Sequence, residues 1–278
     1  MRTPWGLLRA SHPEPGAAVT AVAVLLAAGA GHDAGGAALV GLTVLATQLA
    51  VGWTNDWIDA TRDKAVGRGD KPLATGAVSR RAVGVAGVAA ALATPLVGLT
   101  LGLPAAAAIT AALASALLYN WPLKLTPASV LPYAFSFATL PAFVILALPG
   151  APRPPLWIVA AGGLLGAGAH FANVLPDLDD DERTGVRGLP HLIGPAWSRT
   201  AAAGLLLAAT LTLVFGPPGR PSWYGIAAVA AAAVVLPVGW YTGRLASSRG
   251  ARPVAVFRAV LVVALIDVLL LVTSGRVV

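Results

Sequence analysis

The chain has no cysteine and few charged residues. The absence of cysteine excludes disulfide bonds and metal sites built from thiolates. Only 11% of the 278 residues are charged, whereas a soluble domain has roughly a quarter of its residues charged. Hydrophobic residues make up 57% of the chain, and its mean hydropathy is +0.77. The composition therefore excludes an ordinary soluble domain and predicts an integral membrane protein.

Apolar runs long enough to cross a bilayer follow one another along the whole chain. A spanning helix needs about 20 mainly apolar residues, and Pro, Gly and charged residues separate the runs. We predict nine spans, at 16–31, 37–57, 82–101, 104–120, 130–148, 156–175, 197–216, 223–242 and 253–273. The predicted fold class is all-α, a polytopic bundle of nine transmembrane helices that forms one domain over residues 1–278.

The basic residues lie mainly on one side of these spans. With the N-terminus inside, Arg153, Arg220 and Arg276 lie outside, Arg258 lies within the last span, and the other fifteen of the 19 Lys and Arg are cytoplasmic. This asymmetry follows the positive-inside rule and predicts a multi-pass protein of the cytoplasmic membrane. Because the cations are spread over short loops, the net charge of +7 does not indicate nucleic-acid binding.

Nine of the twelve acidic residues fall in two short segments, 55–70 and 173–182. Carboxylates at membrane segments persist mainly where they bind a cation, line a wet cavity or relay protons. From the first residue of each segment onward, Asn, Asp, Asp, Gly, Pro and Gly recur at identical spacing: Asn55, Asp59, Asp63, Gly67, Pro72, Gly76, and Asn173, Asp177, Asp181, Gly185, Pro190, Gly194. The constant offset of 118 residues indicates an internal duplication, with both copies entering the membrane in the same direction.

The first three polar residues of each copy are four residues apart, which predicts a column of oxygen ligands on one helix face. If both helices end at the same depth, the two columns face each other and the site faces the cytoplasm. Oxygen ligands without cysteine suit Mg²⁺, which prefers one or two carboxylates together with waters and substrate phosphates. A diphosphate is therefore the expected missing ligand, and cations beside the carboxylates fit it: Arg62, Arg68, Lys71, Lys124, Arg183 and Arg187.

Three segments closely resemble the UbiA superfamily of intramembrane prenyltransferases. They are NDWIDATRD at 55–63 followed by DKPLATG, YNWPLKLTP at 119–127, and NVLPDLDDDERTGVRGLP at 173–190. The resemblance runs from the first span to the last and implies a bundle of nine helices. One departure is Gly188, which stands where the family usually has Thr before Leu-Pro.

The resemblance implies that Mg²⁺ binds the diphosphate of an isoprenyl donor, and that an aromatic or lipid acceptor attacks the carbocation left when the diphosphate departs. Metal ions and cationic side chains stabilise the developing negative charge. The residues implied as catalytic and metal-binding are Asp56, Asp59, Asp63, Asp177 and Asp181. The residues predicted to bind substrate are Asn55, Arg62, Arg68, Lys71, Tyr119, Lys124, His170, Asn173 and Arg187.

Several alternatives stay open. A UbiA-type terpene cyclase would ionise the same diphosphate without an acceptor, and a carboxylate-lined cation transporter would also use intramembrane acids and repeats. The loop cations are alternatively topological charges only. His170 lies on the same helix face as Asn173, so it either contacts an acceptor or is a hydrogen-bonded histidine of the bundle. For Asp267, deep in the last span, we expect an interhelical hydrogen bond.

Overall fold

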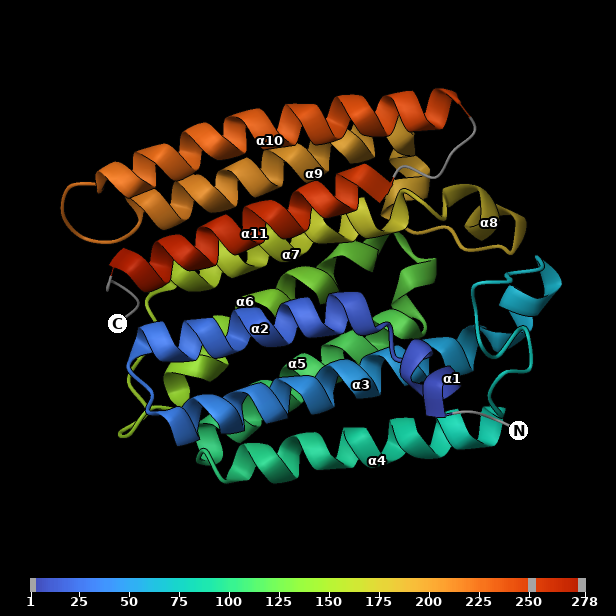
Figure 1. Cartoon of the computed structure of the whole chain (residues 1–278), viewed down its shortest axis with the longest axis horizontal. Coiled ribbons are helices and arrows are strands. Elements are labelled where there is room, and N and C mark those ends of the chain that lie inside the picture. The colour runs from blue at the N-terminus through green and yellow to red at the C-terminus, as the bar shows by residue number, and fades with distance from the viewer. Residues whose placement is uncertain (1–3, 250–253, 275–278) are drawn as a thin grey trace.

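Long helices make up most of the computed structural model, which describes residues 4–249 and 254–274 (Figure 1). The long helices are α2 (Pro13–Ala30), α3 (Ala34–Ala65), α4 (Arg80–Leu99), α5 (Leu103–Asn120), α6 (Val130–Leu146), α7 (Leu156–Val174), α9 (Leu189–Phe215), α10 (Trp223–Ser248) and α11 (Val254–Ser274). The short ones are α1 (Pro4–Arg9), α8 (Leu178–Arg183) and two 3₁₀ turns, η1 (Leu123–Leu125) and η2 (Pro127–Ser129). The described residues contain no strand, which confirms the predicted all-α class.

Eight of the helices within the described residues are long and apolar enough to cross a membrane, namely α2 to α7, α9 and α10. The chain is therefore a multi-pass membrane protein, as its composition predicts. Helix α11 coincides with the predicted span at 253–273, and the count of nine spans stays a prediction. The two largest boundary differences are eight residues each: α9 begins at Leu189 rather than at residue 197, and α3 ends at Ala65 rather than at residue 57. Arg62 and Lys64 in its last turn favour this extension, because cations stabilise the C-terminal end of a helix.

The duplication extends through most of the chain. A shift of 118 residues carries α2 onto α6, α3 onto α7 and α8 together, α4 onto the later part of α9, and α5 onto α10. The repeated glycines agree, because Gly67 and Gly185 have φ of 70° and 81°, and Gly76 and Gly194 have φ of 75° and 77°. Residues other than glycine rarely adopt these angles. The repeated glycines therefore preserve the same backbone turns in both copies.

The second acidic motif does not lie on one continuous helix, so the predicted single column of oxygen ligands is wrong for this copy. Helix α7 ends at Val174, and Asp177 is the N-cap residue of the short helix α8. Pro176 explains the break, since proline lacks the backbone N–H that would continue the helical hydrogen bonds and its ring clashes with the preceding turn. The corresponding residue of the first copy is Ile58, and α3 runs through it without interruption.

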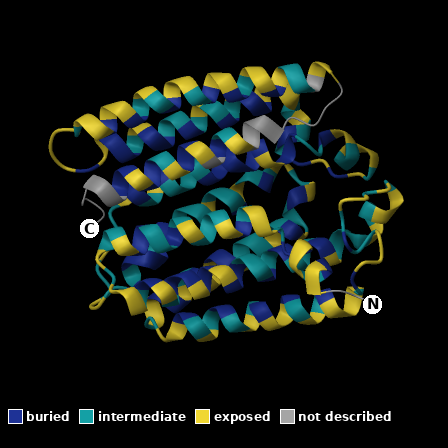
Figure 2. Cartoon of the chain, in the orientation of Figure 1, coloured by how far each residue is buried: buried dark blue, intermediate teal, exposed yellow. Residues whose placement is uncertain are grey.

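The bundle places glycine where helices approach closely and large apolar side chains where lipid would lie. A Cβ atom added to Gly166 of α7 would lie 2.5 Å from the Tyr133 carbonyl oxygen of α6, so Gly166 is a close contact between these two helices. Exposed residues lie along the outer side of α4 (Figure 2), including an apolar stripe at helical spacing: Val85, Val88, Leu92, Leu96 and Leu99. Such a stripe suits contact with lipid.

Candidate active site

An elongated cavity of about 820 Å³ runs between the helices from the two acidic motifs into the apolar interior. This volume lies within the range of about 300–1,000 Å³ that is usual for small-molecule sites. Twelve of the fourteen predicted site residues line it: Asn55, Asp59, Arg62, Asp63, Arg68, Lys71, Tyr119, Lys124, His170, Asn173, Asp177 and Asp181. The apolar part of the wall includes Val22, Leu26, Ile109, Phe137, Leu165 and Leu213. The other two predicted site residues, Asp56 and Arg187, do not line the cavity.

Asp59 of the first motif is held by two cations. The Lys124 Nζ atom donates to both carboxylate oxygens of Asp59, at 2.7 and 2.6 Å, and Arg62, one helical turn later, donates to the same carboxylate. Lys124 projects from η1, and its side chain is only 8% exposed. Burial lowers the pKa of Lys124, while the neighbouring Asp59 opposes that shift. The loop after α5 therefore supplies a buried ammonium group directly beside the first motif, as the resemblance implies.

Arg68 links the two motifs. Its guanidinium donates to both carboxylate oxygens of Asp70, at 2.9 and 2.8 Å, and to Asp177 Oδ1 at 3.1 Å. These hydrogen bonds and the carboxylate charges raise the pKa of Arg68 further above its ordinary value, with Asp70 as the largest cause. Asp177 belongs to the second copy, 109 residues away in sequence. The two acidic motifs thus meet at one end of the bundle, as the repeat predicts.

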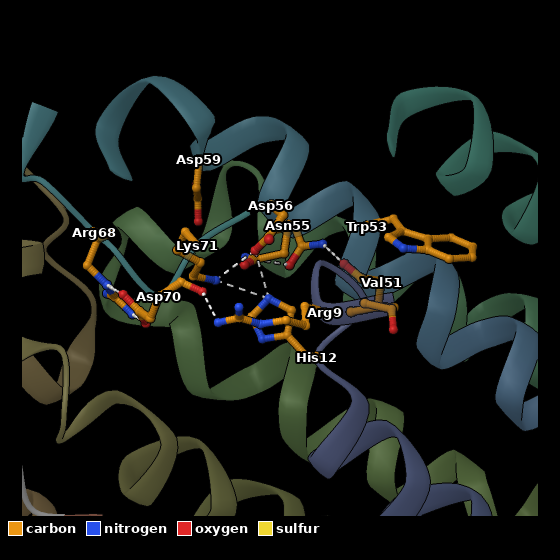
Figure 3. A network of polar contacts seen from close by, with 12 residues as sticks. Arg9, His12, Val51, Trp53, Asn55, Asp56, Asp59, Arg68, Asp70 and Lys71 are labelled. Carbon is orange, nitrogen blue, oxygen red and sulfur yellow. Dashed lines mark hydrogen bonds and ion pairs between the residues drawn. The ribbon is translucent and has the colours of Figure 1, made fainter. Parts of the chain in front are cut away.

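Asp56 is buried within a cluster that it forms with Lys71 and His12 (Figure 3). Its Oδ1 atom accepts from Lys71 Nζ at 2.7 Å and lies 2.8 Å from His12 Nε2. Lys71 Nζ is also 3.1 Å from the same imidazole nitrogen. Oδ2 of Asp56 has no hydrogen-bond partner among the residues that the structure describes. Asp56 therefore positions Lys71, which does line the cavity, and its role as a metal ligand stays a prediction.

His12 is a cavity residue that the sequence analysis missed. The N-terminal segment carries it to the site by binding two other elements. Arg9 donates to the Asp70 carbonyl oxygen at 3.2 Å, and the Trp53 indole donates to the Leu7 carbonyl oxygen at 2.9 Å. No periodicity or spacing in the sequence singles out His12. The one sequence signal for it is that histidine is rare in this chain, which has only four.

An aromatic layer follows the charged end of the cavity. The rings of Tyr119 and Tyr133 are 4.8 Å apart, and each lies near the His170 imidazole, at 5.6 and 5.1 Å. His170 Nε2 is 3.0 Å from Ser129 Oγ, so His170 is a hydrogen-bonded histidine of the bundle that also lines the cavity. Asn173 donates to the Tyr133 hydroxyl at 3.1 Å. This contact joins the second motif to the aromatic layer.

The second motif has a further histidine that the sequence analysis missed. The His191 side chain is 3% exposed, lines the cavity, and places Nε2 3.4 Å from Asp181 Oδ2. It directly follows the Leu-Pro pair that ends the motif, which was the available signal. Gly188, before that pair, is confined by packing, because an added Cβ would lie 2.8 Å from Lys124 O and from Ser129 Oγ. The absence of the family's usual Thr therefore has a steric reason.

Two predicted residues have other surroundings. Arg187 is exposed and does not line the cavity, so its substrate-binding role stays a prediction. Asn55 lines the cavity but donates its amide to Asn120 Oδ1 at 3.3 Å, and Asn120 in turn donates to the Val51 carbonyl oxygen at 2.9 Å. The Asn55 amide is thus fixed by α5, which orients it in the wall.

Comparison with known proteins identifies the family. Residues 17–262 match the model of the UbiA prenyltransferase family. The chain belongs to this family. It is therefore an intramembrane prenyltransferase, and the resemblance seen in the acidic motifs is confirmed. No curated protein sequence is significantly similar to this UbiA family member.

Solved structures agree with the fold of this UbiA family member. A UbiA homologue from Archaeoglobus fulgidus bound to GPP and Mg²⁺ has a TM-score of 0.71 at 17% identity, covering 97% of this chain and 98% of its own. The apo structure of a UbiA homologue from Aeropyrum pernix K1 has a TM-score of 0.71 at 22% identity, covering 94% and 96%. A digeranylgeranylglyceryl phosphate synthase has a TM-score of 0.68 at 15% identity, covering 99% of both chains. At these identities the likeness establishes the fold.

The oxygen ligands that this UbiA family member offers fit a Mg²⁺ ion that binds together with a phosphate group. Within residues 4–249 and 254–274, no group of three or more acidic or histidine side chains is close enough to hold a metal ion by itself. Four of the carboxylates that line the cavity, Asp59, Asp63, Asp177 and Asp181, supply hard oxygens from the two motifs. Mg²⁺ commonly takes one or two carboxylates and completes its shell with waters and substrate phosphates. Such a site does not require a complete protein cage.

Proposed function

We propose that this protein is a Mg²⁺-dependent prenyltransferase that moves an isoprenyl group from its diphosphate to an aromatic or lipid acceptor and releases diphosphate. The observation that carries the proposal is the division of one cavity into two chemically different parts. Carboxylates and cations from both motifs line one end, and apolar side chains line the rest. An isoprenyl diphosphate has the same division between an anionic head and an apolar chain.

In this proposal the charged end binds the diphosphate. Asp59, Asp63, Asp177 and Asp181 hold Mg²⁺, which neutralises charge on the departing diphosphate. Lys124, in the cavity wall, donates hydrogen bonds to oxygens that the metal leaves exposed. The other cations of the wall, Arg62, Arg68 and Lys71, have the same role. Their present bonds to Asp59, Asp70, Asp177 and Asp56 keep them in place at this end of the cavity.

The aromatic layer and the apolar interior suit the carbon chain. Tyr119, Tyr133 and Phe137 line the cavity beside the second motif, where a carbocation would form as the carbon–oxygen bond breaks. Aromatic faces attract cations, and the apolar wall excludes water that would otherwise quench the carbocation. Attack by the acceptor forms the new bond, and loss of a proton from an aromatic or hydroxyl acceptor restores neutrality.

Three further observations support this assignment. UbiA homologues from Archaeoglobus fulgidus were solved with GPP and with DMAPP, each together with Mg²⁺, which supports an isoprenyl diphosphate as donor. The excess of basic residues in the loops at the acidic end of the bundle supports a site that faces the cytoplasm from the cytoplasmic membrane. A cation transporter would be expected to have carboxylates near the bilayer midplane, whereas both motifs adjoin helix ends.

The test is diphosphate release by the purified protein given geranyl, farnesyl or geranylgeranyl diphosphate with Mg²⁺, followed by mass analysis of the organic product. Release that requires a bacterial lipid or aromatic extract supports transfer, and the mass gain identifies the donor chain. If diphosphate is released without any acceptor and the product is a terpene, the protein is a cyclase and not a transferase. Absence of release under all these conditions contradicts the proposal.

Matched variants connect the activity to the cavity. Asp181→Asn, in the cavity wall, should abolish release. Asp179→Asn changes a residue of the same motif whose side chain is exposed and does not line the cavity. This variant should therefore still release diphosphate. Equal loss in both variants would contradict the assignment of the site to this cavity.

A further inference from the structure

Asp267 is a buried carboxyl group at the apolar end of the same cavity. It lies on α11, thirteen residues after the helix begins at Val254, which corresponds to about 20 Å of helix. Figure 1 shows that α11 starts near α8 and runs toward the opposite end of the bundle. Asp267 is therefore far from the acidic motifs, although one cavity reaches both.

The surroundings of Asp267 leave half of its carboxyl group without a partner. The residue is 1% exposed. Oδ2 accepts a hydrogen bond from the Thr210 hydroxyl of α9 at 3.1 Å, which confirms the expected interhelical bond. Oδ1 has no hydrogen-bond partner among the described residues. A buried polar atom without a partner is costly, and acids inside membrane proteins commonly mark ligand sites.

The cavity residues beside Asp267 that the structure describes are apolar. Cavity residues near Asp267 on α11 are Ala264, Val268 and Leu271, and α9 contributes Leu213. Arg258, nine residues earlier on α11, points to the opposite side of the helix. A donor group carried into the cavity beside Asp267 would therefore supply the hydrogen bond that Oδ1 lacks among the described residues.

We propose that Asp267 forms a second polar subsite, which binds a hydroxyl group carried on the far part of an isoprenoid or lipid chain. A hydroxyl is suitable because it donates a hydrogen bond to a carboxylate oxygen and adds little bulk to an apolar chain. The inference rests on the proposed function, since it takes the cavity to hold such a chain. It extends that function by assigning selectivity for oxidised chains over plain hydrocarbon chains.

The experiment compares binding of plain and ω-hydroxylated chains to the full-length protein in detergent, by titration calorimetry with Mg²⁺ and without acceptor. The diphosphates of geranyl, farnesyl and geranylgeranyl chains form one arm, and the corresponding free alcohols form the other. We expect at least one ω-hydroxylated chain to bind about threefold to tenfold more tightly than its parent, the effect of one net hydrogen bond. A preference confined to diphosphates assigns the hydroxyl to the donor. A preference confined to free alcohols assigns it to a separate lipid.

Variants distinguish this subsite from a merely structural bond. Asp267→Leu should remove the preference for the ω-hydroxylated chain over its parent, whereas Asp267→Asn, which keeps an acceptor oxygen, should retain part of that preference. Thr210→Val removes the interhelical bond but keeps the carboxyl group, so the preference should persist. Thr212→Val is the matched control, because Thr212 also bonds the carbonyl oxygen four residues earlier but does not contact Asp267.

The outcomes separate the two proposals. If no ω-hydroxylated chain is preferred, or if the preference survives in Asp267→Leu, the subsite is overturned while parent diphosphate binding still supports the proposed function. If parent diphosphates do not bind, the proposed function fails first. Should Asp267→Leu not fold, Asp267→Asn must reduce the wild-type preference while Thr212→Val leaves it unchanged, and any other result overturns the subsite.

Discussion

Aligned at the offset of 118 residues, the two acidic motifs share backbone turns but differ in charge. Arg62 of the first copy corresponds to Asp180 of the second, and Lys71 corresponds to Leu189. The carboxylates also differ in exposure, since the side chain of Asp59 is 15% exposed and that of Asp177 is 36% exposed. The first copy thus combines acids with cations that hold them, and the second presents more open acids. Metal and phosphate binding together require both kinds of surface.

The largest effect should come from removing an acid of either copy. Asp59→Asn and Asp177→Asn each remove one oxygen charge from the proposed metal site, and each should reduce diphosphate release about 10²- to 10³-fold. Steady-state release with saturating Mg²⁺ measures this. If only one variant loses activity, the two copies do not form one shared site.

The next effect concerns the cation that serves the first copy. Lys124→Met removes the ammonium group beside Asp59, and we expect diphosphate release to fall about 10- to 100-fold, because a charge-assisted donor to phosphate is lost. Lys124→Arg should retain more of the rate, since it keeps the positive charge. If Lys124→Met and Lys124→Arg release diphosphate at the same rate, the positive charge of Lys124 does not contribute to the reaction.

A smaller effect should follow from making the second copy resemble the first. Pro176→Ile introduces the type of residue found at Ile58 and allows α7 to continue, which would displace Asp177 and Asp181. Because misplacement of catalytic groups by about 1 Å costs up to 10²-fold, we expect release to fall about tenfold. Pro237→Ala is the control for removal of a proline, since Pro237 lies inside α10 and outside the cavity wall. Unchanged release in Pro176→Ile would mean that the helix break does not position the motif.

The smallest effect concerns Gly188, which is the residue of the second copy that corresponds to Asp70 of the first. Gly188→Ala places a methyl group against Lys124 O and Ser129 Oγ, and overpacking of this kind costs about 1–3 kcal/mol. The thermal unfolding midpoint in detergent should therefore decrease. Gly204→Ala is a matched control, because nothing lies within 4 Å of a Cβ added there. An equal decrease in both variants would exclude steric confinement at residue 188.

The sequence predicts much of the fold because its signals are local. Apolar runs limited by Pro, Gly and charge mark the spans, and the repeated spacing marks the duplication and the acidic residues at the charged end of the cavity. The same local reasoning was wrong at the second motif, where Pro176 ends α7 before the helical column is complete. The predicted span at 37–57 also ends eight residues before α3 does, because the polar residues mark the limit of the apolar run and not of the helix.

By itself, the sequence determined the membrane class, the family resemblance and the residue types of the site, because these depend on composition and on spacing along one chain. Tertiary structure alone decided which partners each side chain meets. His12 reaches Asp56 across 44 residues, and Arg68 reaches Asp177 across 109. Asp267 likewise meets the cavity only because α11 closes it against α7 and α9. Such contacts depend on how distant helices pack, and no local pattern in the sequence encodes that packing.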